Sequence, residues 1–194
     1  MPNGNAAWGL TPRRQRSGET ENGSLNEYYV DPAYATALFP GDPVILSGSG
    51  SPEGVPGVVA ATQGATNRIT GVVVGFRPAP VIVAQGYLPA STGGYVLVSD
   101  NPDTEYEIQE DGVGGTLAVT SIGLNADLIS AAGSPFLKRS GWMLDSSTAG
   151  TGATLQVRIL GLEQRADNEL GQYAKWIVRL NLPTEMGISS GVGV

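Results

Sequence analysis

The sequence predicts an all-β fold, a compact β-barrel or β-sandwich of many short strands with an extended N-terminal arm. Glycine (28) and proline (13) make up about a fifth of the 194 residues, and both residue types break helices and mark turns. Runs rich in Val, Ile, Tyr and Thr alternate with clusters of Gly, Pro, Asn and Asp, as strands alternate with turns. The chain length fits one domain, and 41% hydrophobic residues are enough to build its core.

About eleven segments have the composition of strands. In chain order, the expected strands are 27–30, 43–47, 58–62, 69–77, 81–88, 95–99, 105–109, 116–120, 141–145, 153–162 and 174–182. The turn Pro40-Gly41-Asp42-Pro43 leads into the second of them, with prolines that fix φ and a glycine that permits positive φ. Only residues 124–132 look helical, with Asn125 as a cap and Gly133 as a stop.

Two of these segments alternate most clearly between apolar and polar residues, and we expect them to pair. The alternating apolar residues are Leu155, Val157 and Ile159 in the first segment and Trp176, Val178 and Leu180 in the second. Trp142 and Trp176 lie inside strand patterns, so burial in the core is favoured over a role as ligand platforms.

The chain divides into an extended arm at 1–27, a β-rich domain at 28–182 and a C-terminal tail at 183–194. The arm has few large apolar side chains, so we expect a partner to order it and the domain to fold without residues 2–18. Arg13, Arg14 and Arg16 give residues 1–18 a charge of +3, which leaves −10 for the remainder of a chain of net charge −7. Trp8 and Leu10 are candidate anchors in a partner's groove, and the three arginines are expected to pair with acidic groups.

Composition excludes several classes of function. The chain has no Cys and no His, so disulfides, thiolate metal sites and the commonest general base are absent. The net charge of −7 repels phosphate backbones, so nucleic acid is not an expected partner. No apolar run reaches the roughly 18 residues of a spanning helix, and the N-terminus does not resemble a signal peptide, so no membrane association is expected.

Candidate sites for chemistry have simpler structural explanations. The carboxylates that could form a glycosidase pair occur mainly at turns, where acidic residues cap and bend the backbone; they are Asp42, Asp100, Asp103, Glu107 and Asp145. Asp100, Asn101, Asp103 and Glu105 could bind Ca²⁺ but lack the spacing of an EF-hand loop. We therefore expect no catalytic residue, no metal site and no cofactor.

Three groups of motifs resemble small structural proteins of tailed bacteriophages. The first is Ala37-Leu38-Phe39-Pro40-Gly41-Asp42-Pro43-Val44-Ile45-Leu46. The second is Tyr95-Val96-Leu97-Val98-Ser99-Asp100-Asn101-Pro102-Asp103 with Tyr106-Glu107-Ile108-Gln109-Glu110-Asp111. The third is Gly141-Trp142-Met143-Leu144-Asp145-Ser146-Ser147 with Leu160-Gly161-Leu162, Asp167-Asn168-Glu169-Leu170-Gly171 and Ala174-Lys175-Trp176-Ile177-Val178-Arg179. The chain thus resembles the head decoration or cement proteins of these phages.

The resemblance implies a non-enzymatic virion protein, made in the host cytoplasm, that binds the outer surface of the capsid. Its partner would be the major capsid protein, and a homo-oligomer is expected because capsid axes repeat identical surfaces. The capsid-anchoring candidates are then Trp8, Leu10, Arg13, Arg14 and Arg16. The alternative is a head fibre or a receptor- or carbohydrate-binding β module, in which Tyr87 or Tyr95 would offer stacking surfaces.

Overall fold

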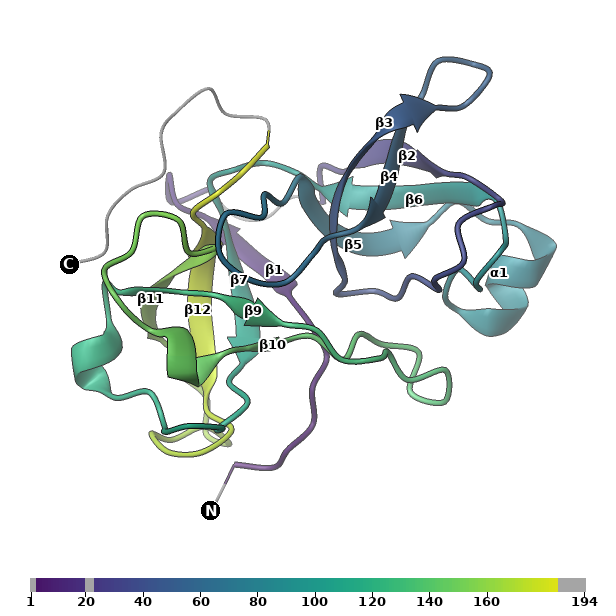
Figure 1. Ribbon diagram of the computed structural model, residues 1–194. Coiled ribbons are helices and arrows are strands. Elements are labelled where there is room, and N and C mark those ends of the chain that lie inside the picture. Colours follow the sequence, from purple (N-terminus) through teal and green to yellow (C-terminus); the bar gives the residue numbers. More distant parts are fainter. Residues whose placement is uncertain (1–2, 20–22, 185–194) are drawn as a thin grey trace.

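The protein is nearly all β, with 37% strand and 7% helix in a computed structural model that describes residues 3–19 and 23–184. This confirms the predicted fold class. Figure 1 shows two β-structures side by side, a small barrel and a five-stranded sheet, with the chain passing from the sheet into the barrel and back. The expected C-terminal tail lies outside the described residues, apart from 183 and 184.

The barrel is closed by five strands in the order β2-β4-β3-β5-β6. These strands are β2 (Asn26–Val30), β3 (Pro43–Gly50), β4 (Pro56–Ala60), β5 (Gly71–Phe76) and β6 (Gly94–Ser99). The ring closes because β2 pairs in antiparallel fashion with β6 and in parallel with β4. Valines from all five strands, including Val44, Val73 and Val98, fill the interior. The helix α1 (Pro80–Gln85) follows β5 at one end of the barrel.

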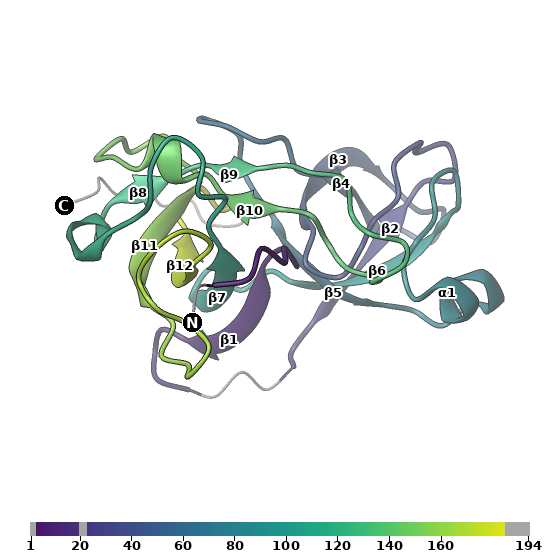
Figure 2. The same cartoon turned by 90° about the horizontal axis from the view of Figure 1, so that it is seen from below.

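The five-stranded sheet is antiparallel and has the order β1-β7-β12-β11-β8. Its strands are β1 (Thr11–Gln15), β7 (Thr104–Gln109), β8 (Asn125–Ala126), β11 (Val157–Leu162) and β12 (Lys175–Leu180). A separate pair, β9 (Leu128–Ile129) and β10 (Met143–Leu144), extends from the sheet toward the barrel (Figure 2). In the described part of the chain there are also the short 3-10 helices η1 (Val119–Ser121) and η2 (Ser146–Thr148).

The predicted pairing of the two alternating segments is confirmed. Val157 and Ile159 of β11 lie opposite Leu180 and Val178 of β12. Trp142 and Trp176 are both core residues, with 5% and 0% of their surface exposed. A single domain core was expected, but the apolar residues form two clusters, because the barrel closes around its own interior. Val72 of the barrel strand β5 belongs to the cluster of the five-stranded sheet, so the barrel wall also covers the sheet.

The prediction of a helix at 124–132 is wrong, because this segment forms β8 and β9. Ala126 and Leu128 both lie in the core, at the spacing of two that a strand requires. The prediction of a strand at 81–88 is also wrong, because residues 80–85 form α1. Pro80 opens this helix and Gly86 ends it in the left-handed conformation, with φ of 72°. Residues 116–120 contain no strand, and η1 begins at Val119.

The N-terminal segment is part of the domain in the structure, which differs from the expected arm. Strand β1 forms the edge of the sheet beside β7, and Leu10 is 1% exposed in the core. Gly9 and Gly41 let the two backbones meet, because a Cβ at Gly41, where φ is 94°, would collide with the carbonyl of Trp8. The amide of Leu10 donates to the carbonyl of Gly41 over 3.0 Å. Residues 3–19 are therefore ordered by their own chain.

Candidate functional site

Strand β7 places two carboxylates on the outer face of the sheet. Glu105 and Glu107 alternate with Tyr106 and Ile108, which point into the core. Both glutamates are nevertheless buried, with 2% and 0% of their surface exposed. Buried carboxylates are costly unless cations and hydrogen bonds compensate them, so the outer face of β7 must be covered by cationic groups.

The arginines of the N-terminal segment supply this cover. Arg13 pairs with Glu107, while Arg14 and Arg16 donate to Glu105 over 2.6 and 3.1 Å. Burial alone would raise the pKa of Glu105, but the hydrogen bonds and positive charges of the two arginines outweigh it, and the pKa falls below its usual value. The arginines thus have the acidic partners that the sequence predicted, but these partners belong to the same chain.

The five anchoring candidates therefore have different surroundings. Leu10 lies in the core, where it cannot reach a partner without leaving the fold. Arg14 and Arg16 lie over Glu105. Trp8 and Arg13 line a surface cavity of about 490 Å³, and the structure brings only these two candidates together there.

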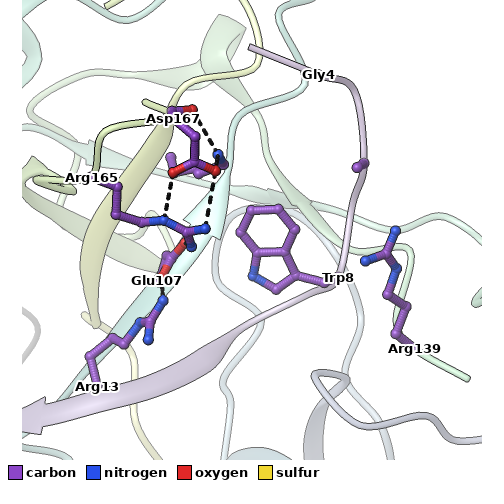
Figure 3. Close-up of a pocket in the computed structure, with 9 residues that line it drawn as sticks. Gly4, Trp8, Arg13, Glu107, Arg139, Arg165 and Asp167 are labelled. Carbon is purple, nitrogen blue, oxygen red and sulfur yellow. Dashed lines mark hydrogen bonds and ion pairs between the residues drawn. The ribbon is translucent and has the colours of Figure 1, made fainter. Parts of the chain in front are cut away.

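Six charged side chains line this cavity, which Figure 3 shows from close by. The cations are Arg13, Arg139, Arg165 and Lys175, and the anions are Glu107 and Asp167. In the figure, the indole of Trp8 points toward Arg165 and Asp167, and Arg139 lies on the other side of the segment that carries Trp8. The cavity has two more cations than anions, although the chain as a whole is acidic. We call it the cationic cavity.

Three of the four cations share the two carboxylates. Arg165 donates to Glu107 and to Asp167, each over 2.9 Å, so it bridges the two acids. The ammonium group of Lys175, 2.7 Å from Asp167, lowers the pKa of that carboxyl to about 2 together with Arg165. Each paired carboxylate thus accepts from two cations. These ion pairs hold one wall of the cavity in place.

Arg139 has no such partner. Among residues 3–19 and 23–184, no carboxylate lies within ion-pair distance of its guanidinium, and its Nε is buried without a hydrogen-bond acceptor. Its position in the loop between β9 and β10 is fixed by a bridge to Ser134 and by the adjacent Ser140, whose amide donates to the carbonyl of Pro40. A guanidinium held in this way is available to an anion from outside the chain.

A second, smaller cavity of about 270 Å³ shares Trp8 and Arg139 with the first. The rest of its lining is mostly apolar and comes from the N-terminal segment, from the turn before β3 and from β5; it includes Leu10, Pro12, Pro40, Val73 and Val74. We call it the apolar cavity.

Sequence reasoning identified Trp8 and Arg13 but missed Arg139, Arg165 and Lys175. The alternation of Glu105 and Glu107 with core residues was the one signal that cations must gather at β7.

The acidic residues that could have formed a catalytic pair have structural contacts instead. Asp42 accepts from the amide of Phe39, and Asp145 accepts from the amide of Ser147 at the start of η2. Asp100 accepts from Asn26 and from the hydroxyl of Tyr28. In the described part of the chain, no three acidic side chains gather as metal ligands, and no helix has the length and apolar character to cross a membrane.

Glu110 is a buried carboxyl at the end of β7. Its Oε2 accepts from the amide of Leu117 over 3.0 Å and from the indole of Trp176 over 3.2 Å, while its Oε1 has no partner among the described residues. Burial raises the pKa of Glu110 to about 7, and the negative charge of Asp111 adds to the effect. Glu110 is therefore largely protonated at mildly acidic pH in the folded protein.

This pKa predicts a pH-dependent stability. Between pH 4.5 and about 7 the folded protein holds a proton on Glu110 that the unfolded chain releases. The free energy of unfolding therefore falls as the pH rises through this window. The difference in pKa corresponds to roughly 3 kcal/mol. We expect Glu110→Gln to remove this loss, so that denaturant unfolding at pH 5 and pH 8 differs less than in the wild type. Replacement of the exposed Glu169 by glutamine should leave the difference unchanged, and an equal effect of both variants would refute the assignment.

The two tyrosines of the alternative hypothesis are engaged within the chain. Tyr87 stacks on Phe39 with the ring centroids 4.6 Å apart. Tyr95 lies under the guanidinium of Arg77, 5.0 Å from the ring centroid, and its hydroxyl donates to Glu53. Each contact covers one face of its ring, and the covered face cannot stack on a sugar.

Comparisons of the chain with protein-family models, with curated proteins and with solved structures give no match. The resemblance to phage head proteins thus rests on the sequence motifs alone, and membership of that family stays a prediction.

Proposed function

We propose that this chain is a decoration or cement protein of a tailed-bacteriophage head, made in the host cytoplasm and bound to the outer surface of the capsid. Its partner is the major capsid protein, and it acts without catalysis, cofactor or metal. By burying contact area across neighbouring coat subunits, it raises the free energy needed to separate them. A homo-oligomer on the local symmetry axes of the capsid is part of the proposal.

The phage and capsid part of this proposal rests on the sequence motifs, and the cationic cavity with Arg139 beside Trp8 supports a binding role. A large aromatic and an arginine are the side chains that most often dominate protein interfaces. The ion pairs of Arg165 and Lys175 hold the wall in place before any partner arrives, which lowers the entropic cost of binding. The cavity is thus suited to binding, and the acids near it are neutralised by cations rather than free for proton transfer.

A second exposed feature favours a binding function. Phe136 is 90% exposed and Leu137 is 52% exposed in the loop between β9 and β10 that also carries Arg139. Large apolar side chains that project from a loop often mark protein interaction sites. Lys138 of the same loop lies against Gly86 at the end of α1, so the loop is supported by the barrel end of the molecule.

The proposal is tested by counting copies of the chain on purified phage heads. A protein that covers the coat lattice is present in a fixed ratio to the coat subunit, whereas a fibre at a vertex is present in far fewer copies. Absence from the heads contradicts both functions.

A further inference from the structure

We propose that the cationic and apolar cavities together bind an extended acidic segment of a partner polypeptide. A carboxylate side chain enters the cationic cavity, and a neighbouring apolar side chain enters the apolar cavity. The inference rests on the proposed function, because it names the kind of coat-protein segment that the site takes.

The charge of the cationic cavity favours an anion. Glu107 is already paired with Arg13 and Arg165, and Asp167 with Arg165 and Lys175. An added carboxylate therefore meets an excess of positive charge, which the internal acids do not cancel. In a partly buried site, solvent and salt screen such an interaction less than they do on an open surface.

Arg139 provides the specific contact. Its guanidinium lines both cavities and has no ion pair among the described residues, so a carboxylate that enters the cationic cavity would be its partner. The planar guanidinium matches a carboxylate with two parallel hydrogen bonds, which an amide of the same shape cannot form with equal strength. The site should therefore distinguish glutamate from glutamine.

The apolar cavity explains why the ligand is a polypeptide rather than a free anion. It adjoins the cationic cavity at Trp8 and Arg139, and its walls include the apolar side chains of Pro12, Pro40 and the exposed Val74. Inorganic phosphate would leave this space unused. A segment with an acidic residue beside an apolar one fills both cavities and gains the free energy of burying apolar surface.

The binding mode is capture of side chains rather than addition of a strand. Strand β1 is an edge of the sheet, but Pro12 has no N–H group and the pairing register shifts between Pro12 and Arg14. Both features interrupt the edge that an added strand would need. The cavities beside this edge remain open to a chain that crosses it.

The test is a titration with the blocked peptide Gly-Glu-Glu-Leu-Gly at low ionic strength, followed through the indole N–H resonance of Trp8 by NMR. The comparison ligands are Gly-Gln-Gln-Leu-Gly, Gly-Glu-Glu-Ser-Gly and inorganic phosphate. We expect the first peptide to bind at least tenfold more tightly than the glutamine peptide, as a charged hydrogen-bonded pair provides. The serine peptide should bind more weakly than the leucine peptide because it leaves the apolar cavity empty.

Variants then locate the site. Arg139→Gln should weaken binding of Gly-Glu-Glu-Leu-Gly about tenfold, whereas Arg68→Gln, which removes an equal charge from an exposed position, should not. Melting curves check that both variants fold. Arg139→Lys keeps the positive charge but not the planar guanidinium, so it should bind the peptide with intermediate affinity. Equal binding of the glutamate and glutamine peptides, or binding of phosphate alone, overturns the inference, as does wild-type affinity in Arg139→Gln.

This result is separable from that of the proposed function. If the chain is found on phage heads and Arg139→Gln attaches as well as the wild type, the inference fails and the function stands. If the peptide binds through Arg139 and the chain is absent from heads, the cavities take another acidic partner and the proposed function fails.

Discussion

Replacing Trp176 with alanine is expected to reduce the free energy of unfolding by about 3–5 kcal/mol, as truncation of a buried aromatic side chain does. Trp176 is fully buried in the core of the sheet, and its indole donates to Glu110. The variant loses apolar contacts and also removes one of the two donors to a buried carboxyl. For a chain of this length the change should lower the melting temperature by roughly 6–20 °C.

Thermal melting of Trp176→Ala and Trp8→Ala checks this prediction. Trp8 is only partly buried and lies at the cationic cavity, so its replacement should cost much less stability. A melting temperature of Trp176→Ala that equals the wild-type value would contradict the position of Trp176 in the core. A larger loss in Trp8→Ala than in Trp176→Ala would contradict the roles of both residues.

Deletion of residues 2–18 is expected to destabilise the five-stranded sheet severely. The deletion removes Leu10 from the core, and a buried Leu replaced by Ala already costs about 2–5 kcal/mol. It also removes both arginines from Glu105 and one of two from Glu107; because these arginines are 40–66% exposed, each pair contributes less than the about 3–5 kcal/mol of a fully buried ion pair. These losses approach the whole stability of a typical domain, about 5–15 kcal/mol. The sequence alone led to the opposite expectation, that the truncated domain folds.

A charge substitution separates the causes. In the full-length protein, Glu105→Gln should destabilise the fold, because it removes the partner of Arg14 and Arg16. In the truncated protein the same substitution should stabilise it, because glutamine carries no uncompensated charge. Circular dichroism and denaturant unfolding of the four proteins measure both effects. A truncated protein with wild-type stability, or Glu105→Gln effects of the same sign in both backgrounds, would contradict the role assigned to β1.

The sequence predicted what depends on local pattern. The alternation in β11 and β12 identified both strands and their pairing, because side chains of a sheet buried on one face repeat every two residues. The segment 81–88 was predicted as a strand because Val81, Ile82 and Val83 favour strands, although Pro80 and Gly86 mark the ends of a helix. The segment 124–132 was mistaken for a helix because its strands are only two residues long.

The candidate site could be predicted only in part, because it is built from distant segments. Trp8 and Arg13 were recognisable as an aromatic and a cation in a polar terminal segment. Their neighbours Arg139 and Arg165 come from loops more than a hundred residues away, and only the folded sheet brings them together. The burial of Leu10 was also hidden, because a lone leucine among polar residues shows no periodicity.

Quantitative mass spectrometry of gradient-purified phage heads, with the major capsid protein as internal standard, counts the copies of this chain on the capsid. A decoration protein should be present in a constant ratio to the coat protein, set by the symmetry axes that it occupies, in every preparation of intact heads. Copies confined to a single vertex would favour the head-fibre alternative. Complete absence from the purified heads would contradict a function on the capsid.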